Sequence, residues 1–143
     1  MMMRRVLLAS VLLLGACAAN TQPPRDDSLY RELGAKPGIT AIVEGMLLHI
    51  AQDERIVGHF RNVNITRLRD KLVEQFCVEA GGPCTYTGDT MAESHKGQNL
   101  TRSDFNALVE DLIKAMEDRH VPVPAQNRLL ARLAPMRGEV IGK

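Results

Sequence analysis

The chain has 143 residues, of which 45% are hydrophobic and 3% aromatic, and its formal net charge is +1. This length suits a single domain, the apolar content indicates a globular protein, and the scarcity of aromatic residues argues against a β-sandwich or β-barrel. The near balance of charges argues against an electrostatic nucleic-acid binder, which normally carries a basic surplus.

The N-terminus is typical of an export signal. Arg4 and Arg5 precede an apolar stretch over residues 6–14, which is too short to cross a hydrocarbon core that needs about 20 residues. The tetrapeptide Leu14-Gly15-Ala16-Cys17 resembles a bacterial lipobox. This resemblance implies cleavage before Cys17 and lipidation of that cysteine, and two or more acyl chains anchor a protein stably. An ordinary secretory signal with an incidental cysteine is the alternative.

These features predict three segments. Residues 1–16 are a lipoprotein signal peptide, residues 17–27 are the lipidated cysteine and a polar, proline-containing tether, and residues 28–143 are the folded domain. We therefore expect an exported protein held at a membrane by its lipid anchor and facing the periplasm or the cell surface.

Two amphipathic helices begin the domain. A short one starts near Ser28 and stops at Gly34. In the next, apolar residues recur at offsets 0, 3, 4, 7, 8 and 11, the stripe of one helix face: Ile39, Ile42, Val43, Met46, Leu47 and Ile50.

A connector with His59-Phe60 leads into a third helix. This helix starts at Asn64, a fair N-cap, and ends at Gly81-Gly82. Its apolar stripe is Leu68, Leu72, Val73 and Phe76.

Two cysteines flank the turn that follows this helix. Cys77 and Cys84 bracket Gly81-Gly82-Pro83, a turn that can bring the two Cα atoms within bridging range. Export favours a disulfide, and closing a loop of about eight residues would stabilise the fold by roughly 2.5 kcal/mol. Two free thiols are the alternative; a metal site lacks further ligands at suitable spacing.

The second half of the domain is also helical. We expect a loop and one short helix holding His95 between residues 85 and 100. A capping box at Thr101 to Asp104 then opens a long helix with the stripe Phe105, Leu108, Val109, Leu112, Ile113 and Met116. The Val-Pro repeat over residues 121–124 breaks it, and a last helix presents Leu129, Leu133, Met136 and Val140, with a kink near Pro135. No segment alternates with period two, so the predicted fold is all-α.

Three motifs stand in order between the two long stripes: Gly81-Gly82-Pro83, Tyr86-Thr87-Gly88 and Met91-x-x-x-His95-Lys96-Gly97. Together with Phe60, about one helix upstream, they resemble the group I truncated haemoglobins over residues 28–140. That family places paired glycines at the end of the distal helix, then a Tyr-x-Gly loop, then the proximal histidine. The family's early Gly-Gly appears here as Gly34-Ala35. The resemblance implies a two-over-two helical sandwich around haem b.

The resemblance also assigns roles to single residues. It makes His95 the proximal iron ligand, a role that suits a neutral imidazole nitrogen. Phe60 matches the phenylalanine that packs on the porphyrin, and Phe76 matches a second aromatic residue of the haem pocket. Lys71 stands where a basic side chain can pair with a haem propionate. Ligation of the iron by Lys71 or His59 in the absence of a gas stays open.

The distal side departs from the family. Many members carry a tyrosine and a glutamine that together hydrogen-bond bound dioxygen. Here the matching positions are aliphatic: Leu47, Leu68 and Leu72. The one polar candidate nearby is Gln75, which replaces a frequently aromatic residue. A hydrogen bond to a charged group contributes about 1.5–3 kcal/mol, so its loss should accelerate dioxygen release on the order of 10- to 150-fold.

We therefore expect a haem protein that binds dioxygen, carbon monoxide and nitric oxide reversibly, as in oxygen transport, rather than an enzyme. Its partners are the gas and, through the lipid anchor, a membrane; nucleic acid is not expected. The first alternative is a nitric oxide dioxygenase or a peroxidase-like enzyme. It would need an unidentified reductase and, for peroxidase work, a distal acid or base. The second is a haem-free helical lipoprotein.

Overall fold

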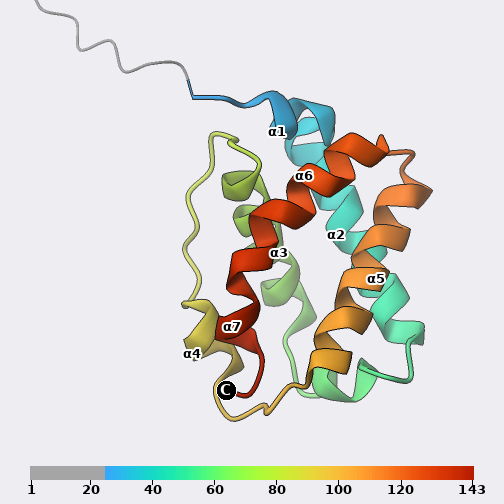
Figure 1. The fold of residues 1–143 in the computed structure, drawn as a ribbon, viewed down its shortest axis with the longest axis vertical. Helices are drawn as coiled ribbons and strands as arrows, with labels where there is room; N and C mark the ends of the chain where they lie inside the picture. The colour runs from blue at the N-terminus through green and yellow to red at the C-terminus, as the bar shows by residue number, and fades with distance from the viewer. Residues whose placement is uncertain (1–24) are drawn as a thin grey trace, which may run out of the picture.

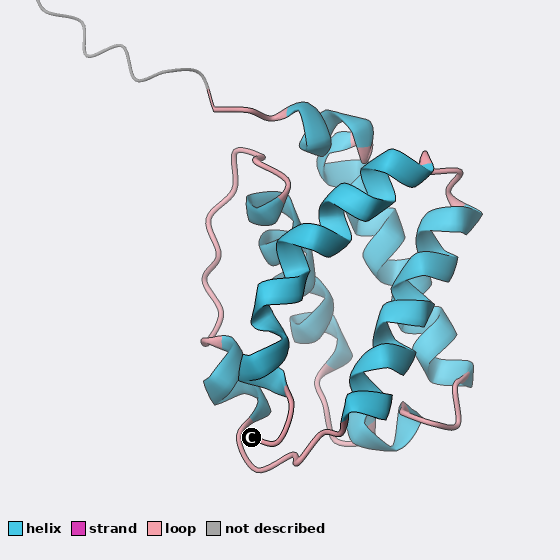
Figure 2. Ribbon diagram, in the orientation of Figure 1, coloured by secondary structure: helices cyan, strands magenta, loops and turns pink. Residues whose placement is uncertain are grey.

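A computed structural model describes residues 25–143, and within them the chain is helical with no strand (Figure 2). The predicted signal peptide and Cys17 lie outside the described residues. The elements are α1 Ser28–Glu32, α2 Ala35–Gln52, the 3-10 helix η1 Val57–Phe60, α3 Ile65–Glu79, α4 Met91–His95, α5 Arg102–Asp118, α6 Val123–Leu133, the 3-10 helix η2 Ala134–Met136 and α7 Arg137–Val140. The all-α prediction is confirmed.

The long helices α2 and α5 pack closely against each other. A Cβ added at Gly45 would lie 3.4 Å from Ala115 Cβ, so small residues on both helices let their backbones approach. The predicted stripe of α2 is buried at Ile39, Ile42, Val43, Met46 and Ile50. Helix α3 also packs against α2.

The predicted starts of α3 and α5 are confirmed. Asn64 caps α3, because its side-chain oxygen accepts a 3.0 Å hydrogen bond from Arg67 N–H. Thr101 and Asp104 form a reciprocal capping box at α5: Asp104 N–H donates to the Thr101 hydroxyl, and Thr101 N–H donates to the Asp104 carboxylate. Local sequence therefore sets where both helices begin.

The paired glycines end α3 as predicted. Gly81 has φ +81°, in the left-handed region that favours glycine, and its N–H donates to Val78 C=O. Gly82 N–H donates to Cys77 C=O at 2.8 Å, which completes a Schellman motif. A Cβ on Gly82 would lie 2.5 Å from the Tyr30 ring, so a larger residue does not fit there.

A disulfide joins Cys77 on α3 to Cys84 in the loop that follows, with the two Cα atoms 5.9 Å apart. It fixes the start of the long connection from α3 to α4. The loop-entropy relation assigns such a closure roughly 2.5 kcal/mol of stability.

The C-terminal helix is interrupted where Pro135 stands. Helix α6 ends at Leu133, a 3-10 turn carries the proline, and α7 resumes the path. The predicted kink is confirmed. The predicted break before α6 is shorter than expected, because Pro124 lies in the first turn of α6, where a proline costs no helical hydrogen bond.

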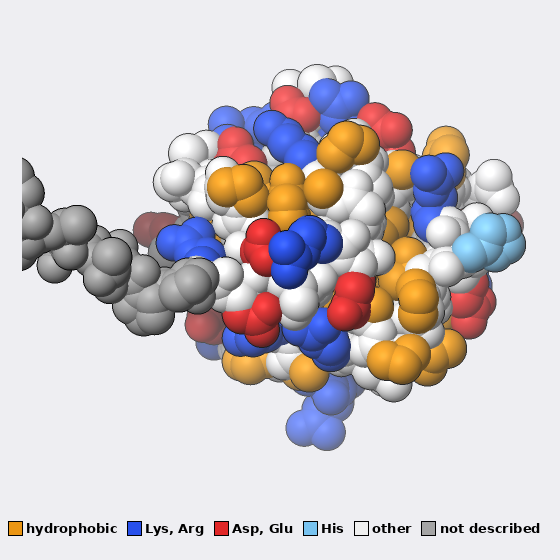
Figure 3. Space-filling view, turned by 90° about the horizontal axis from the view of Figure 1, so that it is seen from above, with side chains coloured by type: hydrophobic (Ala, Val, Ile, Leu, Met, Phe, Trp, Pro, Cys, Tyr) orange, Lys and Arg blue, Asp and Glu red, His pale blue; other side chains and the backbone are white. Residues whose placement is uncertain are grey.

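The described part of the chain enters the fold at α1, and α4, α7 and the C-terminus lie at the opposite end (Figure 1). On the face seen from the α1 end, basic side chains stand among acidic ones (Figure 3). Arg128 illustrates this, since its guanidinium lies 3.1 Å from the Glu32 carboxylate. Among residues 25–143, no helix is both long and apolar enough to span a bilayer.

Candidate functional site

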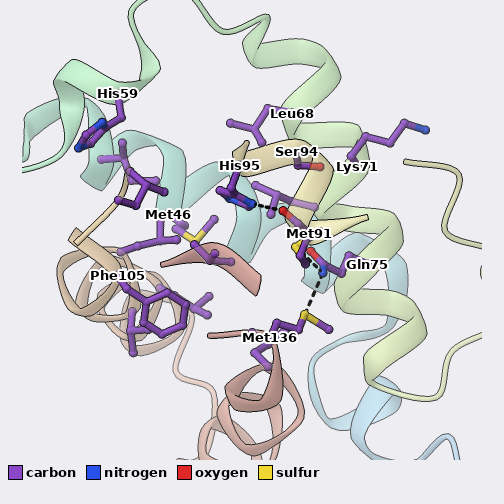
Figure 4. Close-up of a pocket in the computed structure, with 18 of the residues that line it drawn as sticks. Met46, His59, Leu68, Lys71, Gln75, Met91, Ser94, His95, Phe105 and Met136 are labelled. Atoms are coloured by element: carbon purple, nitrogen blue, oxygen red, sulfur yellow. Dashed lines mark hydrogen bonds between the residues drawn. The ribbon is translucent and has the colours of Figure 1, made fainter. Parts of the chain in front are cut away.

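A cavity of about 620 Å³ lies among α3, α4, α5 and the C-terminal helices (Figure 4). This volume is within the range of about 300–1,000 Å³ that is typical of small-molecule and cofactor sites. Most of the lining is apolar and includes Met46, Phe60, Leu68, Leu72, Phe76 and Leu112. The cavity is therefore suited to a large apolar ligand.

His95 lies at the end of α4, half-buried, and lines this cavity. Its Nδ1 is 2.7 Å from the carbonyl oxygen of Met91, one turn earlier on the same helix (Figure 4). Because a carbonyl can only accept, Nδ1 carries the proton and Nε2 keeps its lone pair. This is the tautomer that a metal-binding histidine adopts when a backbone carbonyl orients its ring.

A capping box that the sequence analysis missed fixes the start of α4. Glu93 N–H donates to the Thr90 hydroxyl at 3.2 Å, and Thr90 N–H donates to the Glu93 carboxylate at 3.1 Å. The Thr90 hydroxyl, which donates to the Glu93 carboxylate at 2.7 Å, followed by the Thr90 N–H, lowers the pKa of Glu93. The Thr-x-x-Glu spacing is a recognisable signal of such a box, so the start of α4 was predictable.

Glu74 on α3 binds the loop that leads into α4. Its carboxylate accepts hydrogen bonds from the Thr87 N–H and hydroxyl, both at 2.9 Å, and from Lys71 Nζ at 3.0 and 3.1 Å. The Thr87 N–H, followed by Lys71, lowers the pKa of Glu74 to about 2. Lys71 also bonds to the Thr87 hydroxyl, so the ammonium expected to pair with a propionate is already held by protein groups. Arg67, one turn earlier, also lines the cavity and carries a second cation there.

This carboxylate makes the stability of the fold sensitive to acid. The pKa of Glu74 is about 2 in the folded protein and 4.5 ordinarily, so its contribution is complete above pH 4.5 and is lost as the pH falls towards 2. We expect Glu74→Gln to lower the melting temperature at neutral pH and to flatten its decline between pH 4.5 and 2. Thermal unfolding followed by circular dichroism checks this. Glu79→Gln, which makes the same charge change on α3, is the control; an equal flattening in that variant would contradict the assignment.

Gln75 points away from the position expected of a distal donor. Its side chain is 8% exposed, and its amide Nε2 lies 3.1 Å from Met136 Sδ and 3.4 Å from Met91 Sδ (Figure 4). Met91 is on α4, the helix that carries His95. The amide is therefore directed to the histidine-bearing side of the cavity, which the spacing of residues along α3 alone did not reveal.

The remaining predicted residues divide into two groups. Phe60, Phe76, Leu68 and Leu72 all line the cavity, as does Lys71. Leu47 does not line the cavity. It is half-buried at the edge of the core, and α2 presents Met46 to the cavity instead. Side chains of consecutive helical residues point about 100° apart. A rotation of α2 about its axis by that angle would therefore put Leu47 in the place of Met46.

His59 lines the cavity too, with its Nε2 3.6 Å from Asp104 Oδ1. Asp104 belongs to the capping box that Thr101 forms at the start of α5. The Thr101 N–H and hydroxyl, followed by His59, lower the pKa of the Asp104 carboxyl. His59 therefore lies beside a carboxylate at the edge of the cavity, on the short η1 helix.

Comparison with known proteins identifies the family. The model of the bacterial-like globins matches residues 28–141. The chain is 31% identical over 113 residues to the group 1 truncated haemoglobin GlbN of Mycolicibacterium paratuberculosis, an alignment that covers 79% of this chain and 83% of that one. The chain belongs to the group 1 truncated haemoglobins, within the bacterial-like globin family.

Solved structures of truncated haemoglobins have the same fold. The ferric form from Tetrahymena pyriformis superposes with a TM-score of 0.78 at 27% identity, covering 80% of this chain and 98% of that one. The 2/2 haemoglobin of Synechococcus, with covalently attached haem, gives a TM-score of 0.74 at 21% identity, covering 79% of this chain and 97% of that one. The predicted truncated-globin fold is confirmed.

The cavity of this truncated haemoglobin fits a haem group. An apolar cavity of about 620 Å³ is lined by two histidines, and Nδ1 of His95 is already bonded to a carbonyl, which leaves its Nε2 as a donor for an iron. Arg67 lines the cavity as well and offers a partner for a carboxylate. Volume, apolar lining and donor chemistry agree, and the chain is a haem globin.

Proposed function

We propose that this truncated haemoglobin binds haem b through His95 and uses it to bind diatomic gases reversibly, rather than to catalyse a reaction. The observation that carries the proposal is the imidazole of His95 in an apolar cavity, with its Nδ1 committed to Met91 C=O. That hydrogen bond directs one nitrogen lone pair to a metal. When bound, haem would supply an iron able to take up a diatomic gas.

Other residues of the cavity suit a flat apolar cofactor. Phe60 from η1 and Phe76 from α3 line the cavity and offer ring surfaces for packing. Arg67 and Lys71 also line it and carry the charges that pair with propionates. Of the two, Arg67 is the better candidate, because Lys71 is bound to Glu74 and Thr87.

The aliphatic and thioether side chains that α2 and α3 present to the cavity favour rapid release of a polar gas complex. Helix α3 presents Leu68 and Leu72 to the cavity, and α2 presents Met46. These side chains supply no N–H or O–H donor, and the amide of Gln75 is directed to two thioethers. A nitric oxide dioxygenase needs long retention of dioxygen, so this lining supports reversible binding over that alternative.

The test is spectroscopic. Absorption spectra of the haem-supplemented mature chain in ferric, ferrous and carbonmonoxy forms should show a Soret band that shifts with each state, and flash photolysis should give fast dioxygen dissociation. The absence of a Soret band would point to a haem-free helical lipoprotein. Slow dioxygen dissociation, together with stoichiometric nitrate after anaerobic addition of nitric oxide, would point to the dioxygenase.

We propose further that lipidated Cys17 anchors the protein to a membrane outside the cytoplasm, with the gas as its small-molecule partner. The lipobox Leu14-Gly15-Ala16-Cys17 supports this. Cys17→Ser should move the protein from the membrane fraction to the soluble fraction; unchanged fractionation overturns the anchor.

A further inference from the structure

The side-chain amide of Gln75 is buried between two sulfur atoms. Its Nε2 lies 3.4 Å from Met91 Sδ and 3.1 Å from Met136 Sδ, and the residue is 8% exposed. A thioether can accept but not donate, so the amide N–H groups are the donors in both contacts. Gln75 thereby links α3 to α4 and to η2.

Met91 joins this contact to the histidine. Its sulfur accepts from Gln75, and its backbone carbonyl accepts from His95 Nδ1 at 2.7 Å (Figure 4). The α3 amide and the imidazole ring therefore hydrogen-bond to the same residue of α4, one at its sulfur and the other at its carbonyl oxygen.

Helix α4 needs such an attachment because it has five residues, a single helical turn. So short a helix is not stable by itself and takes its position from tertiary contacts. Its N-terminal box with Thr90 is local and shapes the turn without fixing it to the rest of the fold. Helix α7 packs against the turn, and the contact of Met91 with Gln75 joins the turn to the long helix α3.

We propose that Gln75 is a positioning residue for His95: by holding the Met91 sulfur it sets the placement of α4 and hence the direction of the His95 Nε2 lone pair. This inference rests on the proposed function, because it concerns the bond from His95 to the iron. It assigns Gln75 to the proximal side of the haem rather than to the gas.

The experiment compares Gln75→Leu, Met91→Leu and the double variant, all in the haem-loaded mature chain. Leucine removes the donor in the first and the acceptor in the second while keeping a side chain of similar volume. Resonance Raman spectra of the ferrous, gas-free protein give the iron–histidine stretching band. The rate of haem transfer to excess acceptor apo-globin gives haem retention.

Both single variants should shift the iron–histidine band, and haem transfer should accelerate about two- to tenfold, which is the effect of one ordinary hydrogen bond. The double variant should resemble Gln75→Leu, because that substitution already removes the contact with Met91 along with the contact with Met136. Gln126→Leu is the matched control: Gln126 is 6% exposed and donates to Val121 C=O outside the cavity, so its loss should leave the band in place.

An unshifted band in both single variants overturns the proposal, and so do additive effects in the double variant. If Gln75→Leu fails to fold, Met91→Leu decides alone, because it retains the carbonyl that His95 uses. Failure of the proposed function has a different signature: the wild-type protein would then show no iron–histidine band at all.

Discussion

Replacement of His95 by glycine is expected to abolish stable haem retention. His95 Nε2 is the donor that the cavity offers to an iron, since Nδ1 is bonded to Met91 C=O. Loss of a group that merely orients a ligand lowers metal affinity by about 10- to 100-fold, so loss of the ligand itself should exceed about 100-fold. The rate of haem transfer to acceptor apo-globin and the decay of the Soret band measure the effect.

Added imidazole should partly restore haem in this variant, because glycine leaves space for a free ring at the same place. His120→Gly is the control. His120 is exposed, lies outside the cavity lining and has φ +53°, a backbone conformation that glycine adopts readily. If His95→Gly retains haem and binds gas at wild-type levels, another group of the protein holds the iron.

The sequence was sufficient to predict the helices because each is specified locally. The α2 stripe, the Asn64 cap, the Thr101 box and the glycine pair after α3 each depend on residues within one or two turns. The position of His95 on a short helix was predicted in the same way. Family resemblance then supplied what periodicity could not, namely that the stripes enclose a haem cavity.

The features of the site that the sequence alone did not reveal depend on contacts between distant segments. The direction of the Gln75 amide is set by Met136, 61 residues later in the chain, and Lys71 is held by Thr87, 16 residues later. Neither contact leaves a periodic signal. Met46 and Leu47 are adjacent within one apolar stripe, so hydrophobicity alone cannot decide which of them lines the cavity.

Replacement of Leu72 by glutamine is expected to slow dioxygen dissociation by roughly 10- to 150-fold. Leu72 lines the cavity from α3, and glutamine adds an amide donor there at similar volume. Bound dioxygen carries partial negative charge, and a hydrogen bond to a charged group contributes about 1.5–3 kcal/mol, which corresponds to that change in rate. Carbon monoxide is less polar, so its dissociation should change less. Flash photolysis and ligand-replacement mixing give both rates.

The matched control is Leu48→Gln, the same substitution on α2 at a side chain that is 67% exposed and does not line the cavity. It should leave both dissociation rates unchanged. If Leu72→Gln slows the dissociation of dioxygen and of carbon monoxide equally, the glutamine obstructs the path by which the gas leaves the cavity and does not hydrogen-bond to the bound dioxygen. If the wild type already releases dioxygen as slowly as the variant, another residue near Leu68 and Leu72 already donates a hydrogen bond to the bound gas. The prediction of an apolar distal side would then be wrong.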